Sequence, residues 1–229
     1  MTLQEHFSLL PFNTFGIECD AQWFAKNNSA ATLRSIVQSD VFRSNRVLHI
    51  GRGSNLLFLN DYNGLVIHSA IRSVRVVEHD EDSVLIEAGA GMVWDELVHY
   101  AVSNGWWGIE NLSLIPGETG AAAVQNIGAY GVEINDVLVS VTVLSLKTGQ
   151  ELTLPVWECG YGYRTSIFKT TAKNEFAVLS VRMVLSRLPK PKLTYPQLEN
   201  EVKKRGELTL STIRNTIIEI RSSKLPDPA

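Results

Sequence analysis

The chain contains 229 residues, of which 45% are apolar and 20% are charged, and its formal net charge is −3. This balance is typical of a globular protein and excludes a disordered chain. The sequence has no run of about 20 apolar residues and no block of basic residues. We therefore expect neither a membrane nor a nucleic acid as a partner.

The two cysteines, Cys19 and Cys159, form no CxxC pair and no Cys/His cluster. Isolated thiols of this kind are typical of a reducing compartment rather than of a disulfide framework. The first residues also lack the basic start and apolar stretch of a signal peptide. We therefore expect a cytoplasmic protein. We also expect it to be a monomer.

The first part of the chain is predicted to alternate between strands and a helix. Apolar runs predict strands at residues 21–25, 47–50 and 65–67. Ser29 is a typical N-cap for a helix that carries Leu33, Ile36 and Val37 on one face. A polar junction at residues 69–72 predicts a domain boundary.

The second part is predicted to mix strands and helices. Strands are predicted at residues 74–78, 84–87, 139–146, 150–154 and 176–185. Apolar residues at helical spacing from Trp94 predict a helix that ends at Asn104-Gly105. A last helix is predicted to start near Ser211 or Thr212 and to stop before Leu225-Pro226.

Residues 51–55 read Gly-Arg-Gly-Ser-Asn and begin like the GxGxxG dinucleotide fingerprint. Leu56 occupies the third glycine position, and the apolar residues after it indicate an extended segment rather than a helix. A Rossmann domain is therefore disfavoured. A glycine turn can still bind phosphate through consecutive backbone N–H groups. The alternative interpretation is a plain connecting turn.

Residues 115–131, IPGETGAAAVQNIGAYG, hold four glycines and four alanines. Glycine is needed where φ is positive or where a ligand approaches the main chain closely. Gly120 to Ala123 predicts a bare backbone surface, with the amides of Gln125 and Asn126 beside it. That combination suits a flat ligand with several negative charges. Close packing between a helix and a sheet selects the same small residues and remains an alternative.

Arg164 stands among aromatic residues. It is either a fixed cation that stabilises developing negative charge or a solvated residue that rests on a ring. The five histidines lack metal-ligand spacing, so we predict no metal site. His49 and His68 lie in apolar runs and are interpreted as core residues.

Taken together and in order, seven segments resemble the UDP-N-acetylenolpyruvoylglucosamine reductase family, which are FAD-dependent enzymes of peptidoglycan-precursor synthesis. The segments are residues 13–16, 51–55, 110–117, 125–131, 163–169, 193–195 and 224–228.

The resemblance implies an α+β chain with the two-lobed FAD-binding fold of the vanillyl-alcohol-oxidase-like flavoproteins. It implies a small lobe at residues 1–70 and a larger lobe with a C-terminal helix at residues 71–229. Two glycine turns, without a helix dipole, would supply the N–H groups that hold FAD. The implied cofactor-binding residues are Gly51, Arg52, Gly53, Ser54, Asn55, Ile115, Pro116, Gly117, Gly120, Ala121, Ala122, Gln125, Asn126, Gly128 and Gly131.

The implied activity is the NADPH-driven reduction of UDP-N-acetylglucosamine enolpyruvate to UDP-N-acetylmuramate, with FAD as the cofactor. Arg164 falls on the family's catalytic arginine, which polarises the substrate carboxylate and stabilises the enolate. Tyr195 falls on a tyrosine that contacts the nucleotide substrate.

Two departures from the family pattern change these expectations. The family continues past Leu-Pro-Asp-Pro with a proton-donating serine and a substrate-binding domain, so we expect an FAD-binding fragment with little or no turnover. Ala121 and Ala122 replace hydroxyl residues, which puts a side-chain hydrogen bond to FAD in doubt. A non-catalytic flavin-binding module that acts through a partner chain is the alternative. An oxidase-type relative is disfavoured because no His or Cys lies near the glycine turns to tether FAD.

Overall fold

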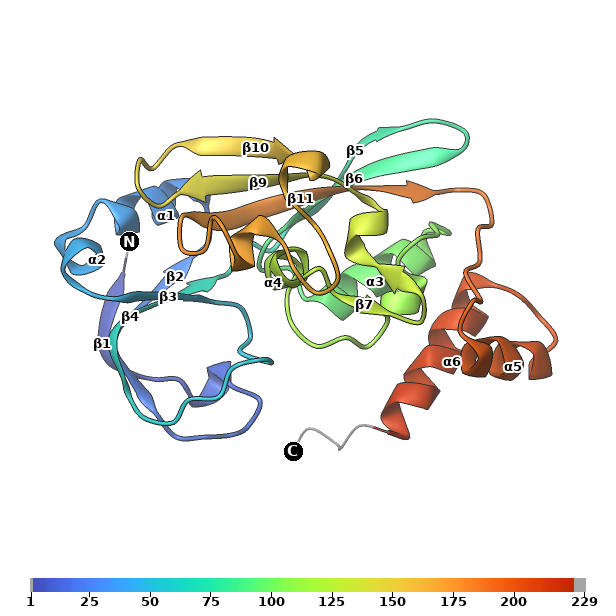
Figure 1. The fold of residues 1–229 in the computed structure, drawn as a ribbon, viewed down its shortest axis with the longest axis horizontal. Coiled ribbons are helices and arrows are strands. Elements are labelled where there is room, and N and C mark those ends of the chain that lie inside the picture. The colour runs from blue at the N-terminus through green and yellow to red at the C-terminus, as the bar shows by residue number, and fades with distance from the viewer. Residues whose placement is uncertain (1, 225–229) are drawn as a thin grey trace.

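Two β-sheets organise the molecule in the computed structural model, which describes residues 2–224 (Figure 1). The first sheet has the strand order β1-β2-β4-β3, and the second has the order β10-β9-β11-β6-β5. The first sheet contains β1 (Leu3–Ser8), β2 (Asp20–Asn27), β3 (Val47–Ile50) and β4 (Tyr62–Ser69). The second contains β5 (Val74–His79), β6 (Ser83–Gly89), β9 (Leu138–Ser145), β10 (Glu151–Pro155) and β11 (Phe176–Ser186).

In the first sheet, β4 lies between β2 and β3 and runs parallel to both. The crossover between β2 and β3 is made by α1 (Ala30–Val37) and α2 (Asp40–Ser44). Ser29 caps α1 as predicted, because its hydroxyl accepts a hydrogen bond from the N–H of Thr32 at 3.1 Å. The predicted apolar face of α1 is buried.

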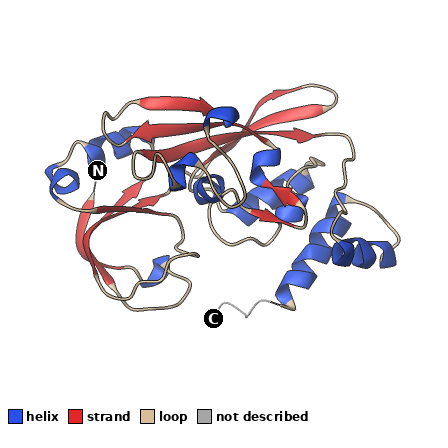
Figure 2. Cartoon of the chain, in the orientation of Figure 1, coloured by secondary structure: helices blue, strands red, loops and turns tan. Residues whose placement is uncertain are grey.

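The second sheet is antiparallel, and α3 (Trp94–Ser103) and α4 (Thr119–Gln125) lie against one of its faces (Figure 2). Every second residue of β6 is buried against the apolar face of α3. Side chains on one face recur every 2 residues in a strand and about every 3.6 residues in a helix, so the two apolar faces can pack on each other. Val184, whose position in β11 alternates with the buried Met183 and Leu185, lies on the opposite face of the sheet and is exposed.

The two sheets share a hydrophobic core. Ala25, Leu33, Ile36, Leu65 and Ile67 come from the first sheet and α1, and Leu144, Ala177 and Leu179 come from the second sheet. A division into residues 1–70 and 71–229 remains a proposal. It is supported by the membership of the sheets, since the first uses residues 3–69 and the second uses residues 74–186.

After the two sheets, the chain forms α5 (Pro196–Lys204) and α6 (Leu210–Ser222). These two helices pack on each other, on the side of the molecule away from the first sheet (Figure 1). Thr209 caps α6 by accepting a hydrogen bond from the N–H of Thr212. The predicted stop at Leu225-Pro226 and most of the segment 224–228 lie outside the described residues.

The predictions missed β1, α2 and α5, and the expectation that the glycine turns lack a helix is wrong. Residues 119–125 form α4, inside the stretch interpreted as bare backbone. The close-packing alternative holds for Gly120, because a Cβ there would lie 2.7 Å from the Cβ of Ala90. The small residues therefore let α4 pack closely on the residues that follow β6.

Candidate functional site

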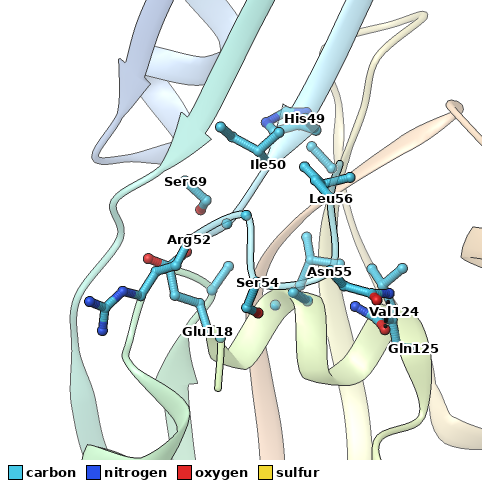
Figure 3. Close-up of a pocket in the computed structure, with 18 of the residues that line it drawn as sticks. His49, Ile50, Arg52, Ser54, Asn55, Leu56, Ser69, Glu118, Val124 and Gln125 are labelled. Carbon is cyan, nitrogen blue, oxygen red and sulfur yellow. Dashed lines mark hydrogen bonds between the residues drawn. The ribbon is translucent and has the colours of Figure 1, made fainter. Parts of the chain in front are cut away.

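Two adjoining cavities, of about 230 Å³ and 270 Å³, lie between the sheets beside α4. The first is lined by residues 49–56, by both ends of α4 and by residues 176–178 of β11 (Figure 3). The second is lined by residues 115–118, by α4 and by Gly128, Arg164 and Arg221. The residues common to both linings are Ser54, Asn55, Gly117, Glu118, Ala121 and Gln125. The cavities therefore form one groove between the two sheets.

The turn at residues 51–55 lines the groove and has a row of unused backbone donors. Among the hydrogen bonds of residues 2–224, none is donated by the backbone N–H of any residue in this turn. Gly53 has φ +69°, and a Cβ at this position would overlap the carbonyl oxygen of Phe12. Consecutive free N–H groups in a turn of positive φ form the kind of concavity that binds anions.

The start of α4 adds one more free donor. The N–H of Thr119 donates to the Met92 carbonyl at 2.9 Å, and that of Gly120 donates to the Ala90 carbonyl at 2.8 Å. These bonds fix the helix against the residues after β6. The next N–H, that of Ala121, donates to no group in the described part of the chain, and Ala121 lines both cavities.

The groove also has apolar walls and a link across it. Phe176, Ala177 and Val178 line the first cavity together with Ile50 and Val124. The amide of Asn55 donates to the amide oxygen of Gln125 at 3.1 Å, which joins the glycine turn of the first lobe to α4 (Figure 3). Flat aromatic groups prefer such apolar walls with a few polar contacts.

Two arginines bring positive charge to the second cavity. Arg164 has a left-handed backbone, with φ 56°, and its guanidinium donates to the carbonyl of Gly128. Lys169 donates to the Arg164 carbonyl at 2.8 Å, so the turn is held from both sides. Arg221 reaches the same cavity from α6 and donates to the Leu114 carbonyl at 3.2 Å.

Comparisons with known proteins identify the chain's relatives. The family described as FAD binding domain matches residues 21–155. The UDP-N-acetylenolpyruvoylglucosamine reductase of Bacteroides fragilis strain YCH46 is 46% identical over 226 residues, which are 99% of this chain and 68% of that protein. The enzyme of the same name from Porphyromonas gingivalis ATCC 33277 is 43% identical over 230 residues, 100% of this chain and 68% of that protein.

The chain belongs to the UDP-N-acetylenolpyruvoylglucosamine reductase family.

Solved structures agree on the fold. The reductase of Thermus caldophilus aligns with a TM-score of 0.73 at 23% identity and covers 99% of this chain and 71% of that one. Alkyldihydroxyacetonephosphate synthase aligns with a TM-score of 0.52 at 13% identity, over 77% of this chain and 34% of that one. The predicted α+β, two-lobed FAD-binding fold of the vanillyl-alcohol-oxidase-like flavoproteins is thereby confirmed.

Most residues that the resemblance to the reductase family implied for FAD lie in the groove, but three predicted residues do not line it. Asn126 is fully buried, and its amide donates to Glu133 and to the carbonyl of Gly162, both at 2.8 Å. A Cβ on Gly131 would overlap the hydroxyl of Thr194. Tyr195 packs edge-on against Tyr130, with ring centroids 5.3 Å apart. Asn126 and Gly131 therefore lie against other loops of the chain.

The sequence also missed residues that line the groove. His49 was interpreted as a core residue, but it lines the first cavity. Burial, with a smaller contribution from His68, lowers the pKa of His49 to about 4, so its ring is neutral at pH 7. Ser69, Glu118 and Arg221 also line the groove. Only proximity in the fold reveals Ser69 and Arg221, which lie far from the glycine motifs in the chain, whereas Glu118 lies inside the glycine-rich stretch itself.

The groove of this reductase-family chain fits FAD on three observations. Free N–H groups suit its pyrophosphate, and apolar walls suit its flat rings. Buried polar atoms without a partner in the described residues, Nδ1 of His49, Oγ of Ser69 and Oε2 of Glu118, belong to residues that line the first cavity. Such atoms are costly unless a ligand or water satisfies them.

No group of three or more His, Cys, Asp or Glu side chains that could hold a metal ion occurs in residues 2–224. None of the helices in the same residues has the length and apolarity that crossing a lipid bilayer requires.

Proposed function

We propose that the chain binds FAD in this groove and serves the NADPH-driven reduction of UDP-N-acetylglucosamine enolpyruvate to UDP-N-acetylmuramate. The observation that carries the proposal is the row of free N–H groups at residues 51–55, in the same cavity as the free N–H of Ala121. We infer the reaction from the chain's membership of the reductase family, and the position of the cofactor from this groove.

In this proposal the turn at residues 51–55 and the residues from Ile115 to Gly128 bind the pyrophosphate and the flat rings. Backbone N–H groups hold phosphate oxygens without depending on the two alanines that replace hydroxyl residues. When bound, FAD supplies hydride transfer between NADPH and the substrate's double bond.

Arg164 is proposed as the catalytic arginine. Its side chain lines the second cavity, where a fixed guanidinium stabilises negative charge that develops on a carboxylate. Arg221 adds a second positive charge to the same cavity. Tyr195 is proposed to contact the nucleotide part of the substrate, next to Tyr130.

For residues 1–229 alone we propose FAD binding with little or no turnover, in a monomer in the cytoplasm. The second candidate is a flavin-binding module without its own catalysis. It is favoured by the same cavities, because they account for cofactor binding without any step on a substrate.

The test is to titrate the purified chain with FAD and then add NADPH without oxygen. We expect a yellow protein in which flavin fluorescence changes until the sites are filled, followed by loss of the flavin's visible absorbance when NADPH is added. A protein that stays colourless in excess FAD would refute the proposal. Bound flavin that NADPH never reduces would support the binding module.

A further inference from the structure

Glu118 is a buried carboxylate whose two oxygens have different surroundings. Oε1 lies 3.2 Å from Nε2 of His68 in β4, while Oε2 has no hydrogen-bond partner within the described residues. The residue is only 5% exposed, and it lines both cavities of the groove. Figure 3 shows it reaching from the start of α4 toward the turn that carries Arg52 and Ser54.

No group of the described residues donates a hydrogen bond to Oε2. A Cβ on Gly51 would lie 2.9 Å from this oxygen, so Oε2 sits directly against the first glycine of the turn. Arg52 is the nearest cation in sequence to that contact, but no ion pair joins Arg52 to Glu118 in residues 2–224. Folded proteins rarely leave a buried carboxylate oxygen without a donor.

We propose that Oε2 of Glu118 accepts a hydrogen bond from a hydroxyl of FAD, on the ribityl chain or on the adenosine ribose. This inference rests on the proposed function. The ligand group must be a donor, since an ionised carboxylate only accepts. It must also lie next to the anion-binding part of the ligand, because the free N–H groups begin at Gly51, beside Oε2. In FAD the donors bonded closest to the phosphates are the sugar hydroxyls.

The His68 contact gives Glu118 its position. The imidazole holds Oε1, and Oε2 lies against Gly51 of the turn that lines the first cavity. In the absence of ligand the free oxygen is buried without compensation, so Glu118 costs stability that the FAD hydroxyl restores. A residue kept at such a cost is typical of a binding site rather than of the core.

The experiment compares the wild-type chain with Glu118→Ala. The dissociation constant is measured from the change in flavin fluorescence, for FAD and for FAD analogues that each lack one sugar hydroxyl. We expect Glu118→Ala to weaken FAD binding by about tenfold or more, as for loss of a hydrogen bond to a charged group. In the wild type, one deoxy analogue should have a dissociation constant about tenfold higher than that of FAD. In Glu118→Ala, the same analogue and FAD should have equal dissociation constants.

Two further variants make the result specific. Glu96→Ala removes an exposed carboxylate of α3 that pairs with Arg72 and lines neither cavity, so it should bind FAD like the wild type. Glu118→Gln keeps the volume and an accepting oxygen without the charge, and it should show a smaller loss than Glu118→Ala. Without FAD, Glu118→Ala should be at least as stable as the wild type in a urea titration. If Glu118→Ala does not fold, Glu118→Gln with the deoxy analogues gives the answer.

The outcomes separate this inference from the proposed function. Wild type that binds FAD while Glu118→Ala binds it equally well or more tightly would overturn the role of Glu118 and leave the proposed function intact. Equal loss for every deoxy analogue in both proteins would overturn it as well. Wild type that does not bind FAD would overturn the proposed function itself.

Discussion

Gly53, in the turn at residues 51–55, lies directly against the main chain of Phe12. Its positive φ disfavours any residue with a Cβ, and its α-carbon faces the carbonyl oxygen of Phe12. A Cβ therefore meets two obstacles, a strained backbone conformation and an overlap with main chain that has little freedom to move.

We predict that Gly53→Ala lowers the free energy of unfolding by more than about 2 kcal/mol and weakens FAD binding. Gly105→Ala is the matched control, because Gly105 also has a positive φ, +76°, but a Cβ there meets nothing within 4 Å. It should cost only the backbone term of about 1 kcal/mol and leave the FAD dissociation constant unchanged. Urea titrations and flavin fluorescence measure the two effects. Equal losses in both variants would contradict the close approach.

Arg164 also has a positive φ that disfavours a residue with a Cβ, but here the proposed function needs the side chain. A non-glycine residue in the left-handed region stores strain, and such residues concentrate at functional sites. We predict that Arg164→Gly is more stable than Arg164→Ala by about 1 kcal/mol, because glycine removes the strain and alanine keeps it. Thermal unfolding of the two variants decides this. Arg164→Gly being the less stable of the pair would show that the turn is not strained.

At the scale of elements, one ion pair docks the last helix. Arg214 in α6 donates to both oxygens of Asp95 in α3, at 2.7 and 2.8 Å, and to the hydroxyl of Ser113 at 3.0 Å. Burial raises the pKa of Asp95, but hydrogen bonds from Arg214 and from the N–H of Leu114 outweigh it, so this pKa lies below its ordinary value. The pair therefore fixes α6, and with it Arg221, against the groove.

We predict that Asp95→Asn destabilises the protein by about 3 kcal/mol at pH 7, since it leaves a buried guanidinium without its carboxylate. A carboxyl group with a lowered folded pKa stabilises the protein above its unfolded pKa of about 4 and stops doing so as the pH falls through the folded pKa. The difference between variant and wild type should therefore shrink below about pH 4. Urea titrations over a pH series measure it.

Glu219→Gln is the control on the same helix. Glu219 pairs with Arg205 at the surface, with 64% of its side chain exposed, so the change should cost less than about 1 kcal/mol. A difference between Asp95→Asn and wild type that stays constant from pH 7 to pH 3 would argue against an ionised, paired Asp95.

At the scale of the whole molecule, one hydrophobic core contains residues of both sheets. Leu144 and Leu179 of the second sheet are buried together with Leu33 and Ile67 of the first lobe. Unfolding either lobe would expose apolar surface of the other. The groove is built from both lobes, so its shape depends on this core.

We predict a single unfolding transition that coincides in tryptophan fluorescence and circular dichroism, and that FAD at about 100 times its dissociation constant stabilises by about 2.7 kcal/mol. Leu144→Ala should lower the free energy of unfolding by about 2–5 kcal/mol, and the unfolding transition should stay single. Val184→Ala, on the exposed face of the second sheet, should cost much less. Two separate transitions would show that the lobes unfold independently.

Local patterns in the sequence predicted the elements that bury a regular face. The strands at β2, β3, β4, β6, β9 and β11 and the helices α1, α3 and α6 fall where the apolar spacing placed them. β1 was missed because most of its residues are exposed, so no alternation marks it. α4 was missed because its glycine and alanines carry little apolar surface, although they let it pack closely.

The sequence by itself determined the fold class, the reductase family and the glycine turns, because these depend on residue types at short, fixed spacings. Only the tertiary structure decided which of these residues share a groove. It removed Asn126 and Gly131 from the lining and added His49, Ser69, Glu118 and Arg221. The physical reason is that the fold brings free donors, apolar side chains and unpaired charges from distant segments together in one site. Those are properties of what the folded chain leaves unsatisfied, and no local pattern records them.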